Sequence, residues 1–304
     1  MNAVGALNYI LSRILPFVPR PIVRRVSRRY IAGDDLRSAL DVVQRLNGDG
    51  FMATLDVLGE SVSQPSLVTG SVNEYVAGLA AIDRMRLDSN ISVKPTQLGL
   101  QLDFDLCMES MRRLVREAGR LGNFVRIDME DSGCTTATLN LYRQLRDEGL
   151  DNVGVVLQAC MRRSLADLRA LPEGASVRLC KGIYVEPREI AYRDRWIVNR
   201  NFRRLLEEAF DRGCRVGIAT HDEAVVWDAL DLIERRSVPG TAYEFQMLLG
   251  VEERLRRIIR REGHRLRVYV PYGANWYAYS LRRLKENPSI AGHILVGLLR
   301  PARD

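Results

Sequence analysis

Beyond residue 50, short apolar segments alternate with longer segments in which apolar residues recur every three or four positions. The short segments are rich in β-branched residues and lie at Met52–Val57, Ile91–Thr96, Phe124–Met129, Val153–Ala159, Ser176–Lys181, Arg215–Thr220, Tyr243–Leu249 and Arg267–Pro271. The longer segments have a helical period and lie at Val72–Arg86, Asp105–Leu121, Thr135–Glu148, Leu165–Leu171, Glu189–Asp211, Glu223–Arg235, Glu252–Glu262 and Trp276–Lys285. Strands that alternate with helices predict a parallel sheet with right-handed crossovers.

Two α/β architectures fit this alternation, a closed barrel and an open doubly wound sheet. No G-x-G-x-x-G motif follows the first predicted strand, which weakens a dinucleotide-binding open sheet. Eight repeating units and nearly continuous apolar strands favour the barrel. The sequence therefore predicts a (β/α)8 TIM-type barrel that occupies residues 51–304 as the catalytic domain.

The first 50 residues do not share this rhythm, and we expect them to form an N-terminal helical cap or arm. Between Arg13 and Arg29 there are six arginines and no acid, interleaved with apolar residues and interrupted by prolines at positions 16, 19 and 21. Residues Ala32–Leu46 have the pattern of an amphipathic helix. Two interpretations remain open: a cap packed on the barrel, or a foot on an anionic membrane surface.

Composition narrows the classes of partner. The chain has 304 residues, 46% of them hydrophobic, and a formal net charge of +7. Its arginines are spread along the chain among 38 acids, without a recognisable nucleic-acid module, so no nucleic-acid partner is expected. Five cysteines without a C-x-x-C pair indicate free thiols, and no apolar run is long enough to span a membrane. We expect a cytoplasmic protein, at most peripheral on the inner face of the cell membrane.

Polar residues stand at the carboxyl ends of the predicted strands, where the active residues of such barrels lie. They are Lys94, Asp128, Glu130, Asp131, Gln158, Arg178, Lys181, Tyr184, Thr220, His221, Asp222, Glu244, Gln246, Tyr269 and Tyr272, and the apolar Leu248 lies beside Gln246 on the seventh strand. Burying an unpaired charge is costly. The polar members of this set must therefore face a ligand or one another.

The last predicted helix carries a pair of arginines. Tyr279, Arg282, Arg283 and Glu286 are spaced so that all four lie on one helix face. Two adjacent guanidinium groups can hold a carboxylate or phosphate through bidentate hydrogen bonds, and Glu286 can orient either of them. The pattern fits a site for a small acid with a hydrocarbon body, although a surface helix in an arginine-rich chain has the same pattern.

The residues at the strand ends allow two other chemistries, a metal site and a Schiff base. His221 has no second histidine at ligand spacing, so no metal site is predicted. Lys94 or Lys181 could form a Schiff base, as in a barrel aldolase that acts on a small carboxylic acid. Such a lysine needs a lowered pKa, which a neighbouring carboxylate such as Asp128 would oppose.

In these segments the sequence resembles the proline dehydrogenase family, in its short monofunctional bacterial form. The matching stretches are VKPTQLGL (93–100), VRIDMEDS (125–132), VGVVLQA (153–159), VRLCKGIYVEP (177–187), GIATHDE (217–223), YEFQMLLGV (243–251) and VYVPYGANWYAYSLRRLKENP (268–288). The resemblance implies an FAD enzyme that oxidises L-proline to Δ1-pyrroline-5-carboxylate and passes the electrons to a quinone.

The resemblance also implies roles for individual residues. Arg282 and Arg283 should hold the proline carboxylate with help from Lys94, Asp128 should position that lysine or its neighbours, and Arg178 should lie beside N5 of the flavin. The implied FAD contacts also include Met129, Gln158, Lys181, Gly182, Ile183, Thr220 and His221. Glu286 should orient Arg283, and the implied walls around the proline ring are Tyr184, Leu248, Tyr269 and Tyr279.

One position departs from the family pattern. The family usually has alanine where this chain has Ile183, between Gly182 and Tyr184. A branched side chain at this position could narrow the pocket or shift the flavin. Tyr269, placed over the substrate ring, would crowd a 4-hydroxyl group, so the resemblance favours proline over hydroxyproline.

Overall fold

Eight parallel strands close into a barrel in the computed structural model, which describes residues 20–277 and 279–280. The strands are β1 Met52–Val57, β2 Ser89–Val93, β3 Val125–Ile127, β4 Val153–Gln158, β5 Ser176–Cys180, β6 Arg215–Ala219, β7 Tyr243–Leu248 and β8 Leu266–Tyr272. Strand β1 pairs with both β2 and β8, with Ala53 opposite Ser89 on one side and Val268 on the other. The predicted closed barrel is confirmed.

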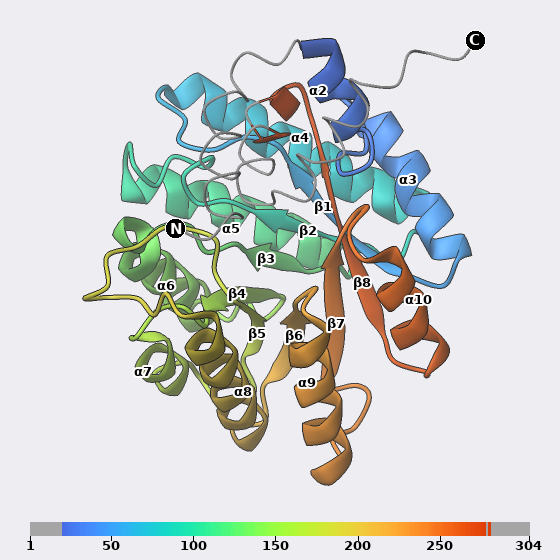
Figure 1. Ribbon diagram of the computed structural model, residues 1–304. Coiled ribbons are helices and arrows are strands. Elements are labelled where there is room, and N and C mark those ends of the chain that lie inside the picture. Colours follow the sequence, from blue (N-terminus) through green and yellow to red (C-terminus); the bar gives the residue numbers. More distant parts are fainter. Residues whose placement is uncertain (1–19, 278, 281–304) are drawn as a thin grey trace.

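Helices surround this barrel on its outer face (Figure 1). They are α3 Leu36–Gly48, α4 Pro65–Arg84, α5 Phe104–Arg120, α6 Ser132–Asp147, α7 Ser164–Arg169, α8 Arg195–Asp211, α9 Glu223–Arg235 and α10 Glu253–Arg261, and α2 Arg20–Ser27 precedes them. The core lies between the two layers, where outward strand residues such as Ile127, Val155 and Leu179 are fully buried. Each helix therefore buries its apolar face against the strands that it connects.

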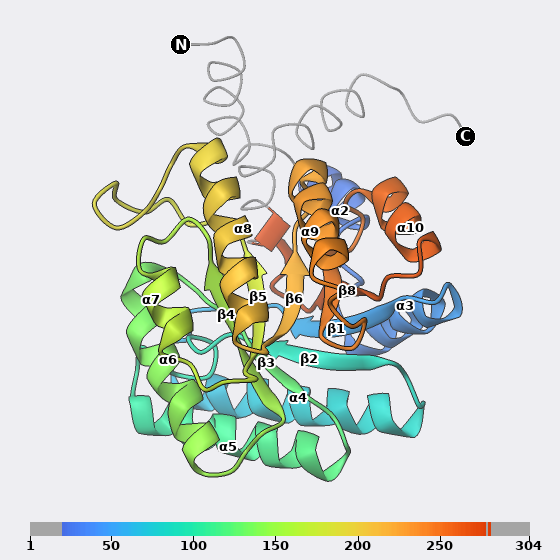
Figure 2. The same ribbon diagram turned by 90° about the horizontal axis from the view of Figure 1, so that it is seen from below.

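Two helices, α4 and α8, begin farthest from the residues at which the apolar pattern predicts their starts. Helix α4 begins at Pro65 rather than Val72, because proline is well suited to the first helical position. Helix α8 begins at Arg195 rather than Glu189, because the Asp194 carboxylate accepts hydrogen bonds from the backbone of Trp196 and Ile197. The segment between β5 and α8 is consequently a long loop that extends away from the barrel (Figure 2).

The interior of the barrel is polar, although its outer wall is apolar. Arg126 on β3 donates to Ser176 on β5, and Arg178 on β5 donates to Gln246 on β7. Glycines make room for these long side chains: a Cβ on Gly154 would lie 2.3 Å from Nη1 of Arg126, and one on Gly217 would lie 2.5 Å from Nε2 of Gln246. The inward side chains thus contact one another across the barrel, as burial of polar groups requires.

The described part of the N-terminal segment packs beside β8. The backbone N–H of Ala32 donates to the carbonyl oxygen of Pro271 (2.9 Å), and that of Gly273 donates to Gly33 (3.0 Å). Helix α3 buries Val43 against the barrel, next to β1 and β8 (Figure 1). Residues 13–19 of the basic stretch lie outside the described residues. None of the helices in the described ranges is both long and apolar enough to cross a membrane.

Candidate active site

A cavity of about 650 Å³ opens at the carboxyl ends of the strands. Every described residue to which the resemblance assigns a role lines it: Lys94, Asp128, Met129, Gln158, Arg178, Lys181, Gly182, Ile183, Tyr184, Thr220, His221, Leu248, Tyr269 and Tyr279. The predicted arginine pair, Arg282 and Arg283, and its neighbour Glu286 lie outside the described residues. The fold thus brings together residues from seven strand ends and from the segment after β8.

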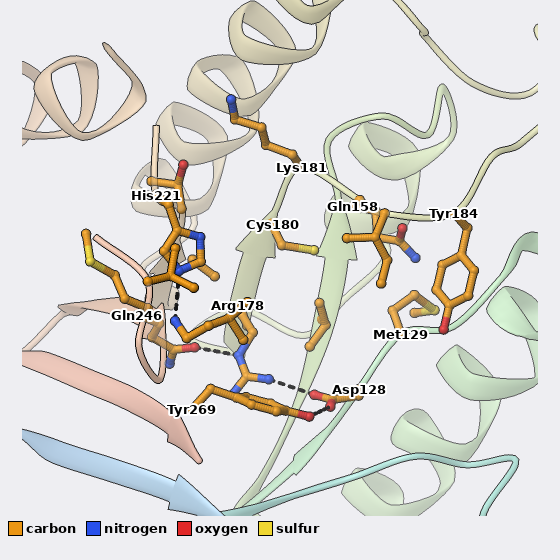
Figure 3. A pocket seen from close by; sticks show the side chains of 18 of the residues that line it. Asp128, Met129, Gln158, Arg178, Cys180, Lys181, Tyr184, His221, Gln246 and Tyr269 are labelled. Atoms are coloured by element: carbon orange, nitrogen blue, oxygen red, sulfur yellow. Dashed lines mark hydrogen bonds and ion pairs between the residues drawn. The ribbon is translucent and has the colours of Figure 1, made fainter. Parts of the chain in front are cut away.

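Arg178 occupies the floor of this cavity, and its guanidinium group has three hydrogen-bond partners, of which Figure 3 shows Gln246 and Asp128. Its Nη1 donates to Oδ1 of Asp128 (2.6 Å), its Nε to Oε1 of Gln246 (2.5 Å) and its Nη2 to Oγ of Ser92 (3.0 Å). The side chain is buried, so these three partners replace the water that a guanidinium group would otherwise bind. Its position is therefore fixed by strands β2, β3 and β7 at once.

Tyr269 on β8 completes this group from the opposite side. Its hydroxyl donates to Oδ2 of Asp128 (2.7 Å), and its ring lies 5.4 Å from the guanidinium carbon of Arg178. Burial and the nearby carboxylates of Asp128 and Asp56 raise the pKa of Tyr269 well above 10. The phenol is therefore a hydrogen-bond donor at neutral pH, and it shares one carboxylate with Arg178 (Figure 3).

Lys94 forms a buried ion pair with Asp56 on β1. Its Nζ lies 2.5 Å from Oδ1 of Asp56, and both side chains are almost completely buried. Desolvation alone would lower the pKa of Lys94, but Asp56 and Asp128 outweigh it and raise the pKa above its ordinary value. Lys94 is therefore a permanent positive charge beside the cavity.

Glu130 and Gln158 connect the next two strand ends. The Gln158 amide donates to the backbone carbonyl oxygen of Glu130 (2.7 Å), and the Glu130 carboxylate accepts from N (2.9 Å) and Oγ1 (2.6 Å) of Thr96. Burial raises the pKa of Glu130 despite these hydrogen bonds. These contacts fix the loop after β2 against the ends of β3 and β4.

The rim of the cavity near β5 and β6 is cationic. Lys181 and Arg195 both form ion pairs with Asp222, whose side chain also caps α9. Desolvation would raise the pKa of Asp222, but hydrogen bonds from Lys181, Arg195 and Asn199 lower it far below its usual range. Two basic groups thus share one carboxylate here, so this part of the rim carries a net positive charge.

Gly182 and His221 shape the backbone of this rim. Gly182 has a φ of +95°, and a Cβ there would lie 2.3 Å from Sγ of Cys160. Nε2 of His221 accepts a hydrogen bond from the backbone N–H of Leu248 (2.8 Å), which indicates a neutral ring with its proton on Nδ1. Within the described ranges, no group of three His, Cys, Asp or Glu side chains could hold a metal ion.

Sequence reasoning missed Asp56 and Arg195, and it named Gln246 only as one of the polar residues along the seventh strand. Asp56 is the partner of Lys94, Gln246 holds Arg178, and Arg195 shares Asp222 with Lys181. An acid inside the apolar segment MATLDV was a signal for Asp56, because a carboxylate at an inward barrel position needs a buried partner. Arg195 follows a loop whose course no short-range pattern specifies.

Comparison with known proteins identifies the family. The family profile described as Proline dehydrogenase matches residues 39–294. Proline dehydrogenase of Deinococcus radiodurans is 34% identical over 300 residues, which cover 94% of this chain and 97% of that protein. Proline dehydrogenase 1 of Bacillus subtilis strain 168 is 34% identical over 275 residues, which cover 90% of this chain and 91% of that protein.

A solved structure supports the fold. The proline utilization A protein of Bdellovibrio bacteriovorus, inactivated by N-propargylglycine, superposes with a TM-score of 0.81 at 23% identity, over 89% of this chain and 34% of that one. The chain thus spans about a third of that longer protein. With the cavity and the two curated relatives, the comparison leads to one conclusion: the chain belongs to the proline dehydrogenase family and is an oxidoreductase.

Proposed function

We propose that the chain oxidises L-proline to Δ1-pyrroline-5-carboxylate with FAD as its cofactor and passes the electrons to a quinone, the first step of proline degradation to glutamate. One observation carries the assignment of the site. All the described residues to which the resemblance gives a role in binding proline or FAD line a single cavity of about 650 Å³ at the catalytic end of the barrel.

The residues of this cavity fit a flavin dinucleotide. Lys181 and Arg195 give the rim a positive charge that suits a pyrophosphate, and Gly182 lets the backbone approach closely where a Cβ would clash. The residues that would hold FAD are Met129, Gln158, Arg178, Lys181, Gly182, Ile183, Thr220 and His221. When bound, the flavin supplies the hydride acceptor at N5.

The chain's own residues would bind and orient the substrate. We assign the carboxylate of proline to Arg282 and Arg283, with Lys94 as a third positive charge and Glu286 orienting Arg283. The ring would lie among Tyr184, Leu248, Tyr269 and Tyr279. Positive neighbours disfavour the ammonium form of the amine, and the neutral amine is the form that can release a hydride from the adjacent carbon. Fixed orientation is the main contribution of the protein.

Two features of the cavity floor support Asp128 and Arg178 as catalytic residues: the hydrogen bonds that Asp128 accepts and the positive charge of the Arg178 guanidinium. Asp128 is the common acceptor for Arg178 and Tyr269, so it fixes both side chains at the point where the substrate ring would lie. The Arg178 guanidinium group, held by Asp128, can stabilise negative charge that develops on a neighbouring ring. Both effects act through preorganised hydrogen bonds.

The Schiff-base alternative finds no support in the electrostatics of the lysines. Asp56 and Asp128 raise the pKa of Lys94, whereas a Schiff-base lysine needs a lowered pKa. The Lys181 ammonium forms an ion pair with Asp222. Borohydride should consequently trap no substrate adduct on either lysine.

For the N-terminal segment we propose a helical cap over residues 1–50, joined to the barrel domain of residues 51–304. The hydrogen bonds of Ala32 and Gly33 with the end of β8 support it. A peripheral contact with the inner face of the cell membrane, in a cytoplasmic enzyme, is the second proposal, and it rests on the six arginines between Arg13 and Arg29. Deletion of residues 1–30 distinguishes the two proposals. If the segment is a cap, the shortened protein should have a lower Tm. If it contacts the membrane, the shortened protein should still fold but should no longer bind vesicles.

An absorbance spectrum tests the enzymatic proposal. The purified protein, supplied with FAD, should show flavin absorbance that bleaches on anaerobic addition of L-proline and returns with a quinone. Hydroxyproline should bleach it more slowly. A protein that takes up no FAD, or a spectrum that proline leaves unchanged, would contradict the assignment.

A further inference from the structure

A second cavity, of about 600 Å³, opens at the opposite, amino-terminal end of the barrel. It is lined by residues at or near the starts of strands, among them Asn90, Arg126, Ser176, Arg215, Glu244, Arg265 and Arg267. Four of these side chains are arginines and one is an acid. Its volume is in the range of sites that bind small molecules.

The charges inside the barrel do not balance at this end. Four basic side chains are buried inside the barrel between its two ends, and three of them have a carboxylate partner: Lys94 pairs with Asp56, Arg178 with Asp128, and Arg267 with Glu244. The fourth, Arg126, forms no ion pair with any described residue. Arg126 therefore has no carboxylate at ion-pair distance among the described residues, and Glu244 and Asp128 attract it only from farther away.

Arg126 is held only by neutral acceptors. Its Nη1 donates to the carbonyl oxygens of Val155 (3.0 Å) and Ser176 (2.8 Å), and its Nη2 donates to Oγ of Ser176 (2.8 Å). Desolvation, with repulsion from Arg178, lowers the pKa of Arg126 to about 9. Carbonyl dipoles thus compensate only part of the cost of burying this charge.

Two further arginines face the same cavity from its rim. Arg215 begins β6 and Arg265 precedes β8, and both are exposed. Within the described part of the chain neither forms an ion pair, and the Arg265 guanidinium contacts Sδ of Met52 (3.5 Å). The one acid of the cavity, Glu244, is already engaged by both Nε (2.7 Å) and Nη2 (3.1 Å) of Arg267.

We propose that this amino-terminal cavity binds a compact polyvalent oxyanion of the phosphate type, with Arg126 below it and Arg215 and Arg265 at its rim. Guanidinium groups recognise phosphate oxygens through paired, charge-assisted hydrogen bonds. The anion supplies the ion-pair partner that Arg126 lacks among the described residues and offsets its repulsion from Arg178. Binding at this site stabilises the folded barrel from the end opposite the flavin cavity.

Titration calorimetry with inorganic phosphate and pyrophosphate tests the site. The protein is saturated with FAD, so that the cationic rim of the flavin cavity is occupied, and the ionic strength is held constant with sodium chloride. The test variant is Arg215→Gln/Arg265→Gln, in which both changes are at exposed positions. The matched control, Arg188→Gln/Arg254→Gln, removes the same charge from exposed arginines outside the cavity.

The wild type and the control should bind the anion, and the anion should raise the Tm of both. The test variant should bind the anion at least about tenfold more weakly. Arg126→Met should lose the anion-induced rise in Tm. Absence of binding up to ~10 mM anion, or equal affinity in the test variant and the control, would overturn the proposal. No proline is present, so the outcome is independent of the proposed reaction.

Discussion

Arg178 and Asp128 form a buried ion pair across the barrel, with 2.6 Å between Nη1 of the arginine on β5 and Oδ1 of the carboxylate that follows β3. The second oxygen of Asp128 accepts from Tyr269 (2.7 Å), so this one carboxylate positions both groups. The two hydrogen bonds leave Asp128 little freedom to rotate. The geometry of the cavity floor therefore depends on the negative charge at this residue.

Asp128→Asn should impair catalysis without preventing flavin binding. The amide keeps the shape of the side chain but loses the charge that holds Arg178, and a hydrogen bond between charged groups contributes about 1.5–3 kcal/mol. We expect kcat/KM for proline to fall about 10- to 100-fold with the flavin content unchanged. Asp147→Asn, at an exposed position of α6, is the control. Equal kcat/KM in both variants would remove Asp128 from the proposed machinery.

The Lys94–Asp56 pair should behave as a coupled unit in stability. Removing one partner leaves a buried charge without compensation, so Lys94→Met or Asp56→Asn alone should destabilise the barrel by about 3–5 kcal/mol. The double variant Lys94→Met/Asp56→Asn removes both charges and should cost less than the sum of the two, by about 1–3 kcal/mol. Urea denaturation of the four proteins measures this coupling. Strict additivity would show that the ion pair is energetically unimportant.

Much of the barrel could be predicted from the sequence because local patterns of apolar and polar residues specify most of its strands and helices. The limits of β1 match the prediction, since an apolar segment between polar ones specifies a buried strand. The start of α8 was predicted six residues early, at Glu189 instead of Arg195. A helical pattern alone does not reveal that Asp194 caps the helix after an irregular loop.

The sequence predicts which residues line the cavity, but it predicts only in part which acid forms an ion pair with which base. Strand ends in a barrel converge, so residues such as Lys94, Asp128 and Arg178 had to meet. Which acid pairs with which base depends on side-chain reach and on the stagger between strands, and these are tertiary properties. The resemblance implies that Asp128 positions Lys94 or its neighbours. In the structure Asp128 attracts Lys94 electrostatically, but its ion-pair partner is Arg178, and the ion-pair partner of Lys94 is Asp56.

Arg283→Ala tests the proposal that Arg282 and Arg283 bind the carboxylate of proline. Both residues lie outside the described ranges. Losing one bidentate arm to the substrate should cost about 2–4 kcal/mol of transition-state stabilisation, seen as a lower kcat/KM for proline. FAD should remain bound, because no role in FAD binding is assigned to Arg283. Arg261→Ala, at an exposed position of α10, controls for the loss of one positive charge. An unchanged kcat/KM for proline in Arg283→Ala would exclude a role of Arg283 in binding the carboxylate.

The cysteines should be unreactive in the folded protein. Burial raises the thiol pKa to about 11 for Cys134 and Cys160 and to about 12 for Cys107 and Cys180. Because only the thiolate reacts, iodoacetamide at pH 8 should label the native protein far more slowly than the urea-unfolded protein.

The raised pKa values of the buried thiols make the free energy of unfolding depend on pH. The folded state keeps protons that the unfolded state loses above pH ~9, so the free energy of unfolding should fall as the pH rises from about 9 to about 12. Urea denaturation at several pH values measures this slope. Replacing Cys107 by alanine should make the slope shallower, and an unchanged slope would contradict the assignment to buried thiols.

Gly182→Ala should damage the cavity proposed to bind the flavin more than the small volume of the added methyl group suggests. The φ of +95° disfavours any side chain, and the added Cβ would meet Sγ of Cys160 at 2.3 Å and Oε1 of Gln158 at 2.8 Å. Strain and overpacking together should cost about 2–4 kcal/mol and displace Gln158, so FAD affinity should fall along with the free energy of unfolding. Gly240→Ala is the matched control, because its exposed position has no atom within 4 Å of the new Cβ and no positive φ. Flavin titration and urea denaturation of both variants decide the matter. If Gly182→Ala bound FAD as tightly as Gly240→Ala, the backbone of this turn would have no part in the cofactor site.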